Sequence, residues 1–161
     1  MRDLAGFVES DGPALLRFAY LLCRDAGRAE DLVQDALVRM MRSQRSVDAP
    51  AAYARKVIVN EYLGWRRRFS SREIVGTDGF DVGVPDPSDA VADRELVWQL
   101  IGSLPPRGRA VLVLRYYSDR PDSEIADCLG CAEATVRSIA ARAFTQLRAH
   151  PQLLSRQPEE A

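Results

Sequence analysis

Apolar residues recur at helical spacing through the first part of the chain, from about Gly12 to Arg68. Residues three and four apart share one face of an α-helix, so each apolar stripe predicts an amphipathic helix. Residues 48–50 (Asp-Ala-Pro) interrupt the pattern and predict a third helix, from about Ala51, because proline is favoured in a first turn. The first two helices are marked by Leu15, Leu16, Ala19, Leu22 and Cys23 and by Ala29, Leu32, Val33, Ala36, Leu37 and Met40.

A second helical block is predicted from about Ala90 to His150. The stretch between the blocks is rich in glycine, proline and serine among acidic residues, a composition that disfavours a packed core. The sequence therefore predicts an all-α fold, with two small helical domains joined by an acidic flexible linker and a helix-turn-helix at the end of the second. The expected boundaries are 1–68 for the first domain, 69–89 for the linker, 90–150 for the second domain and 151–161 for a tail.

The most informative spacing lies between Ile125 and Ile139. A helix-turn-helix needs a small residue where its helices cross, a residue that accepts positive φ at the turn, and apolar residues inside its second helix. Ala126, Gly130 and Val136 meet these requirements in that order. The outer face predicted for the second helix carries no acid and suits the major groove of DNA. It consists of Thr135, Arg137, Ser138, Ala141 and Arg142.

The charges of the chain are almost balanced, with 22 Lys and Arg against 23 Asp and Glu. Net charge alone would argue against a nucleic-acid binder, but the charges are sorted along the sequence. Residues 53–72 carry six basic residues and one acid, and residues 134–150 carry three arginines and no acid. Residues 73–95 carry seven acids and one arginine. Two local basic stripes on either side of an acidic segment therefore favour contact with nucleic acid.

Three cysteines are an unsuitable number for a disulfide framework. Cys128 and Cys131 form a CxxC pair, which in isolation would suit half of a zinc or redox site, but no second pair follows and the one histidine is His150. We interpret both cysteines as structural and expect no metal and no cofactor. No cluster of acids, histidine or serine stands at catalytic spacing, so no enzymatic activity is expected. The sequence has neither an apolar run that would span a bilayer nor the apolar core of a signal peptide, which predicts a cytoplasmic protein without membrane insertion.

Residues 29–37 (AEDLVQDAL) and 104–117 (LPPRGRAVLVLRYY) stand in the two helical blocks. The second segment is followed by the helix-turn-helix, with Leu129-Gly130-Cys131 at its turn. In this order the segments resemble the polymerase-binding segment and the fourth conserved region of the extracytoplasmic-function sigma factors of bacterial RNA polymerase. Tyr53, Val57 and Asn60, followed by Arg66 to Arg68, are similar to that family's −10 segment. Within the family, the chain resembles the SigE-like subset of actinobacteria.

The resemblance implies a subunit that binds core RNA polymerase and directs promoter-specific transcription initiation without a catalytic site of its own. Core RNA polymerase and promoter DNA are the expected partners, and the family adds an anti-sigma factor as a further one. The residues expected to bind polymerase are Asp31, Gln34 and Asp35. Those expected to bind the opened −10 element, by stacking, base-edge hydrogen bonds and phosphate contacts, are Tyr53, Asn60, Trp65, Arg66, Arg67 and Arg68. Those expected to bind the −35 element are Thr135, Arg137, Ser138, Ala141 and Arg142.

Four positions depart from the family pattern. Tyr53 stands where members usually have Trp, Gly64 where they have Asp, and Ala132 where a Ser would cap the recognition helix. Ile139 stands where many members have Arg. A lost serine cap costs about 1 kcal/mol of helix stability. These departures bear on promoter strength and sequence preference more than on the class of function.

Other interpretations remain open from the sequence alone. A stand-alone helix-turn-helix regulator would use residues 104–148 and leave the first block without a role. A thiol or zinc sensor would use Cys128 and Cys131. For Tyr53 and Trp65, packing in the core is as good an explanation as base stacking, and the acidic helix face at residues 31–35 is also compatible with a plain solvated surface.

Overall fold

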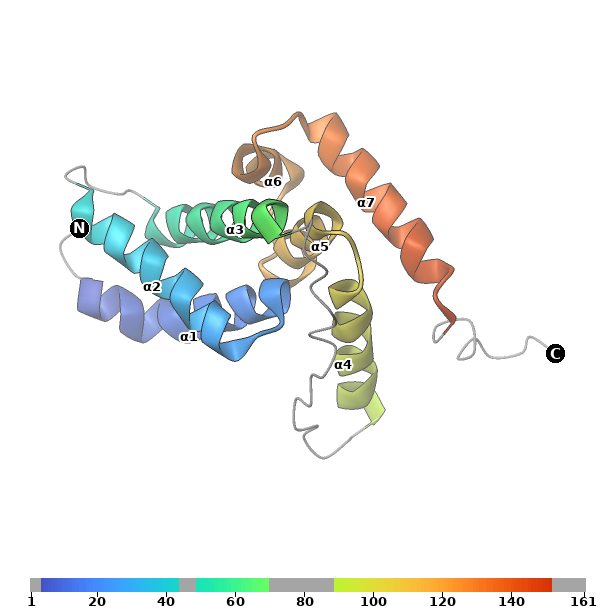
Figure 1. The fold of residues 1–161 in the computed structure, drawn as a ribbon, viewed down its shortest axis with the longest axis horizontal. Coiled ribbons are helices and arrows are strands. Elements are labelled where there is room, and N and C mark those ends of the chain that lie inside the picture. The colour runs from blue at the N-terminus through green and yellow to red at the C-terminus, as the bar shows by residue number, and fades with distance from the viewer. Residues whose placement is uncertain (1–3, 44–48, 70–88, 152–161) are drawn as a thin grey trace.

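The structure is a computed structural model of the 161-residue chain, and it describes residues 4–43, 49–69 and 89–151. Within these ranges the chain forms seven α-helices and one π-helical turn, with no strand. Figure 1 shows the helices as two blocks that lie against each other, with α7 along one side. The all-α architecture predicted from the apolar stripes is therefore observed.

The first block consists of α1 (Leu4–Cys23), α2 (Ala26–Arg42) and α3 (Pro50–Phe69), each packed on the other two. The turn between α1 and α2 places Arg24 at a positive φ of 59°. Asp25 then caps α2, since its carboxylate accepts a hydrogen bond from the backbone N–H of Arg28 at 3.1 Å. This cap satisfies one of the N–H groups that a helix start leaves without a partner.

Helix α1 begins earlier than the apolar stripe indicated. The stripe was predicted to start near Gly12, but the helix already starts at Leu4 and continues through Pro13. Proline inside a helix removes one backbone hydrogen bond. Phe7 is buried in the core, so the turn before the proline is held by packing rather than by propensity.

The second block consists of α4 (Asp89–Gly102), α5 (Pro106–Leu112), the π-helical turn η1 (Val113–Tyr117), α6 (Asp122–Leu129) and α7 (Glu133–Arg148). The sequence predicted one helix that starts within residues 104–107 and carries Tyr117. The structure instead widens the last part of it into η1, where the N–H of Ser118 reaches the carbonyl of Val113 at 3.2 Å. The predicted linker falls almost entirely on residues 70–88, which lie outside the described residues, as does most of the predicted tail.

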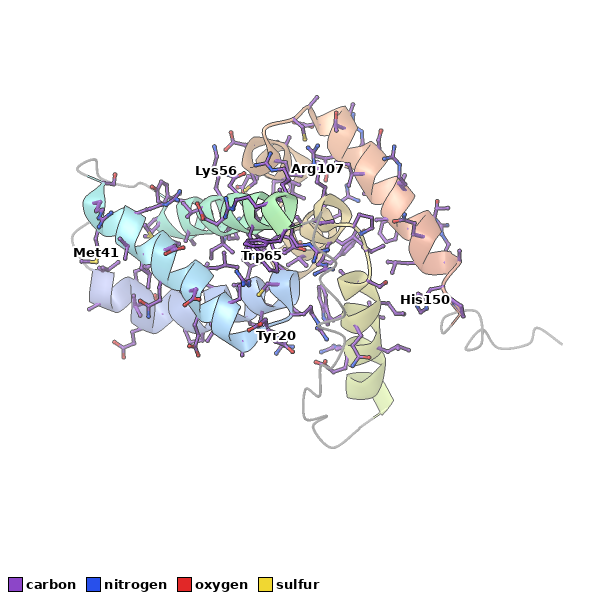
Figure 2. The ribbon with its side chains drawn as sticks, in the orientation of Figure 1. Tyr20, Met41, Lys56, Trp65, Arg107 and His150 are labelled. Carbon is purple, nitrogen blue, oxygen red and sulfur yellow. The ribbon has the colours of Figure 1, made fainter. Side chains whose placement is uncertain are left out.

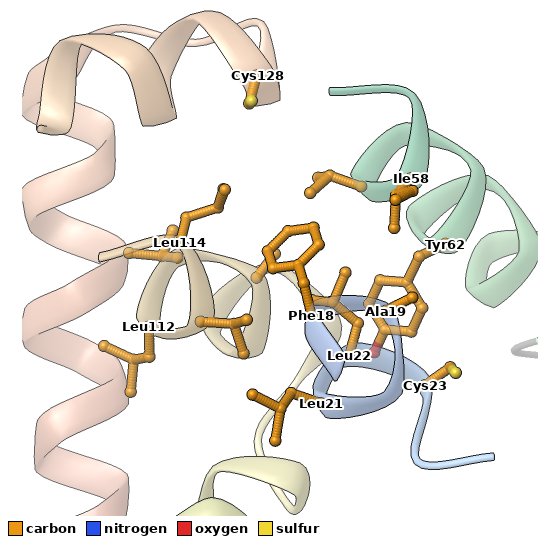
Figure 3. Packing of buried hydrophobic residues seen from close by; sticks show 14 of the residues in the cluster. Phe18, Ala19, Leu21, Leu22, Cys23, Ile58, Tyr62, Leu112, Leu114 and Cys128 are labelled. Carbon is orange, nitrogen blue, oxygen red and sulfur yellow. The ribbon is translucent and has the colours of Figure 1, made fainter. Parts of the chain in front are cut away.

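One hydrophobic core runs through both blocks. Figure 3 shows Phe18 of α1 lying between the second-block segment that carries Leu112 and Leu114 and the residues Ile58 and Tyr62 of α3. Helix α3 packs on α5 and α6, and α1 packs on α4, α5 and η1. The two blocks are therefore joined by apolar contact as well as by the chain between them.

Candidate nucleic-acid and polymerase interfaces

The helix-turn-helix predicted from the sequence is formed by α6 and α7. Gly130 ends α6 with a φ of 65°, and the N–H of Cys131 reaches back to the carbonyl of Ala126 at 3.1 Å. Ile125 and Val136 are fully buried between the helices, and Ala126 is almost so. A left-handed residue closing the first helix and a small residue at the crossing are the features that the spacing predicted.

We expect Gly130→Ala to lower the free energy of unfolding by about 1–2 kcal/mol, the usual cost of a left-handed conformation for a residue with a Cβ. A Cβ at this position would meet nothing within 4 Å, so the cost comes from the backbone alone. Gly130→Asn should be milder, because asparagine tolerates this conformation. Urea unfolding of the parent chain, Gly130→Ala and Gly130→Asn measures the order of their stabilities. Equal stability of all three would contradict the left-handed turn.

The outer face of α7 carries the residues predicted to bind the −35 element, and all of them are exposed. Arg137 lies 3.9 Å from the carboxylate of Glu133 one turn earlier, in an exposed pair of the kind that contributes little stability. The Ser138 hydroxyl donates to the carbonyl of Ala134 at 3.0 Å. Ala132 gives α7 no side-chain cap, as its sequence predicted. Because the ion pair of Arg137 with Glu133 is exposed and weak, the Arg137 guanidinium remains available to a ligand.

Helix α2 presents Asp31, Gln34 and Asp35 on one exposed face. The opposite face of the helix is buried through Leu32, Val33 and Ala36. Within the described residues neither carboxylate on the exposed face forms an ion pair. The face extends toward Met41, which Figure 2 shows at the end of the block away from α7. This face is thus a polar, acidic surface that no other described element covers.

The residues of α3 predicted to bind the −10 element differ in their exposure to solvent. Asn60, Arg67 and Arg68 are exposed, and Arg66 is half-buried. The three arginines occupy the last turn of α3, where positive charge is favourable. Tyr53 and Trp65 are half-buried and pack against the core. The Arg28 guanidinium covers the Trp65 ring at 3.9 Å, so in this state the ring is already engaged within the protein.

A groove of about 860 Å³ separates the C-terminal half of α3 from α7. It brings together Asn60, Arg66 and Arg67 of the predicted −10 set with Thr135, Ser138 and Arg142 of the predicted −35 set. Arg107, at the start of α5, adds another positive charge to the lining, and no acid from the described residues joins it. Arg137, Ala141, Tyr53, Trp65 and Arg68 are not among the groove residues. The result is a basic groove between the two blocks.

Known proteins match the chain over two successive segments. Residues 7–72 match the family model described as Sigma-70 region 2, and residues 100–149 match the one described as Sigma-70, region 4. The RNA polymerase sigma-E factor of Streptomyces avermitilis is 34% identical over 148 residues, which cover 88% of this chain and 81% of that protein. The chain belongs to the sigma-70 family of RNA polymerase sigma factors.

This sigma factor is also similar to the ECF RNA polymerase sigma factor SigL of Mycobacterium tuberculosis, with 34% identity over 83% of this chain and 80% of that one. A similar solved structure is the sigma factor RpoE of Bartonella quintana in complex with the anti-sigma factor NepR. Its TM-score is 0.67 at 25% identity, with 98% of this chain and 100% of that chain covered. The fold, family and class of function predicted from the sequence are confirmed. Sigma factors are non-enzymatic transcription initiation factors.

Arg109 of this sigma factor is a buried charge that the sequence reasoning did not single out. Its side chain is 7% exposed, and burial lowers the pKa of the guanidinium from its ordinary value. It donates hydrogen bonds to the carbonyls of Leu22 at 2.6 Å and Leu104 at 3.3 Å, and also to that of Gly102. Leu22 and Gly102 lie in the last turns of α1 and α4, the negative ends of these helices. The sequence did contain a signal that Arg109 is buried, because Arg109 lies three and four residues before the apolar Leu112 and Val113 and so shares their helix face.

The CxxC pair is part of the helix-turn-helix packing. Cys128 is buried and Cys131 half-buried, and neither forms a disulfide. Burial raises the pKa of the Cys128 thiol, which opposes formation of the thiolate that metal binding and redox exchange require. Within the described residues, no group of three His, Cys, Asp or Glu side chains is arranged to hold a metal ion. Nor is any described helix both long and apolar enough to cross a membrane.

Proposed function

We propose that this sigma factor docks on core RNA polymerase through the exposed face of α2 and reads promoter DNA with α3 and α7. The observation that carries the proposal is the separation of charge: an uncovered acidic face on α2, and basic faces on the two helices that line the groove. Because the face of α2 is acidic and the faces of α3 and α7 are basic, the two kinds of surface attract partners of different charge. An acidic face suits a basic protein surface, whereas arginine-rich faces suit phosphate and bases.

Helix α3 is assigned to the −10 element, opened into single strands. Asn60 is exposed and offers both a donor and an acceptor for the edge of a base, and Arg66 to Arg68 provide a track for phosphates. Tyr53 and Trp65 would stack on bases only after leaving their present packing, since both rings lie against the core. Asn60 and the arginines therefore carry more of this assignment than the aromatic residues.

Helix α7 is assigned to the −35 element as the recognition helix of the helix-turn-helix. Such a helix lies in the major groove, with its N-terminal residues at the base edges. Thr135 and Arg137 occupy its first turns, and Ser138, Ala141 and Arg142 continue the exposed face. Arginine pairs with guanine or with phosphate, and serine and threonine pair with either.

The same proposal assigns residues 1–68 to polymerase docking and the −10 element, and residues 90–150 to the −35 element, with 69–89 as the tether. It places the protein in the cytoplasm, where polymerase and DNA are found, and gives it no catalytic role of its own. An anti-sigma factor is a further proposed partner. This last point rests on the similar RpoE structure, which was solved with NepR.

Run-off transcription with purified core polymerase on genomic fragments tests the proposal. We expect transcripts with defined start sites only when core polymerase and this chain are both present, and upstream sequences that share two elements. Core polymerase alone and this chain alone are the controls. Scattered start sites identical to those of core polymerase alone would overturn the proposed function.

A further inference from the structure

The lining of the basic groove concentrates positive charge in a small space. Arg66 and Arg67 enter the groove from α3, and Arg142 enters it from α7. Arg107, which Figure 2 labels, joins them from the start of α5 and belongs to neither the −10 set nor the −35 set. No acid from the described residues lines the groove, and neither Arg107 nor Arg142 forms an ion pair within that part of the chain. Because like charges around one hollow repel each other, an anion bound among these arginines is favoured.

Another part of the groove lining is apolar. Leu63 of α3, Leu129 of α6 and Ile139 of α7 belong to it. All three are half-buried, so part of each side chain still meets solvent. Covering this surface with the apolar part of a ligand is favourable, because apolar surface is then removed from water. A ligand made of phosphate alone would leave the surface exposed, so the lining suits an anion that also carries an apolar group.

Neutral hydrogen-bonding side chains complete the lining. Asn60 of α3 and Gln146 of α7 each bring an amide, which both donates and accepts, and Thr135 brings a hydroxyl. All three side chains are exposed and so can reach a ligand. Amides and hydroxyls pair with sugar hydroxyls and with the edges of a base, whereas arginine forks pair with phosphate oxygens. The groove therefore presents one kind of partner for each part of a nucleotide.

We propose that the basic groove is a binding site for a nucleotide that carries two or more phosphates. Arg107 and Arg142 hold the phosphates, and the nucleoside lies against Leu63 and Ile139. The groove volume of about 860 Å³ lies within the range of small-molecule sites, about 300–1,000 Å³. The inference goes beyond the proposed function and does not depend on which helix reads DNA. Because both blocks line the groove, the bound nucleotide contacts both.

Isothermal titration calorimetry of the full chain with ATP, inorganic tripolyphosphate and adenosine tests which part of a nucleotide is recognised. The titrations are made without Mg²⁺ and at about 0.15 M salt, where weak attraction between distant charges is screened. We expect ATP to bind at least about tenfold more tightly than tripolyphosphate, a gain that burial of on the order of 60 Å² of apolar surface supplies. Adenosine, which lacks the phosphates, should show no measurable binding. Equal affinities for ATP and tripolyphosphate, or no binding of ATP, would overturn the nucleotide site.

Labelling the glycines of the full chain with ¹⁵N shows where ATP binds. Gly108 and Gly130 line the groove, whereas Gly12 and Gly27 lie in α1 and α2 and are not among the groove residues. We expect the amide signals of Gly108 and Gly130 to shift progressively as ATP is added, and those of Gly12 and Gly27 to stay in place. Shifts confined to Gly12 or Gly27 would place ATP elsewhere and overturn the site.

Substitution of single arginines separates the groove from general attraction to a basic surface. Arg107→Gln and Arg142→Gln should each weaken ATP binding at least about tenfold, because each removes a charge-assisted hydrogen bond to phosphate. Arg137→Gln is the matched control, since Arg137 is an exposed arginine of α7 outside the groove lining, and its affinity should stay within about twofold of the parent chain. All three arginines are exposed, so circular dichroism should show the parent's helical content in each variant. A loss of affinity in Arg137→Gln as large as that in Arg107→Gln would overturn the proposal.

Discussion

Reversing Asp31 and Asp35 to lysine is expected to weaken binding to core RNA polymerase by at least about 100-fold, because like charges placed opposite each other across an interface cost several kcal/mol. Both carboxylates are exposed and form no ion pair within the described structure. The fold should therefore tolerate the change, with a free energy of unfolding within about 0.5 kcal/mol of the parent chain. Titration of labelled chain with core polymerase measures the dissociation constant, and thermal melting measures stability.

The control for this prediction is Glu9→Lys. Glu9 is an exposed acid of α1, and the substitution changes the charge at its site by the same amount as each aspartate reversal does. It should bind core polymerase like the parent chain. The double variant should also regain part of its affinity in higher salt, because salt screens repulsion between exposed charges. Normal binding by the Asp31 and Asp35 double variant would show that this face of α2 is merely solvated, and would remove the proposed docking site.

The helices and the helix-turn-helix could be predicted because their determinants are local. The stripe of Leu32, Val33 and Ala36 fixes which face of α2 is buried, and the same period leaves Asp31 and Asp35 outside. Gly130 could be assigned to a left-handed turn because few other residues adopt that conformation readily. These predictions depended only on neighbours within a few residues, so the sequence order contained the information needed.

The junction of the two blocks could not be predicted in this way. Its contacts join residues far apart in sequence, such as Arg109 and Leu22, which are 87 positions apart. An apolar stripe predicts which face of a helix is buried, but it does not predict which other helix packs against that face. The groove between α3 and α7 could therefore be found only in the structure. The half-buried Trp65 shows the same limit: an aromatic residue beside arginines suits base stacking and core packing equally, and tertiary contact decides between them.

Replacing Arg137 with alanine is expected to cost roughly 1–3 kcal/mol of binding at the −35 element and to relax preference at one or two base pairs. Arg137 lies in the second turn of α7, near the end that meets base edges, and its side chain is 60% exposed. Its exposed pair with Glu133 at 3.9 Å contributes little, so the substitution should leave the free energy of unfolding nearly unchanged. The loss therefore belongs to recognition rather than to folding.

Arg142 should behave differently, because it lies about 1.4 turns further along α7 and points into the basic groove, whereas Arg137 is not among the groove residues. If it mainly holds phosphate, Arg142→Ala weakens all promoters evenly and reduces the salt slope by about one. Arg17→Ala, at an exposed arginine of α1, is the control and should change neither the total output nor the salt slope. Transcription of a promoter library by each variant holoenzyme gives both preference and total output. An Arg137→Ala holoenzyme with the parent's −35 preference and output would mean that α7 is not the recognition helix.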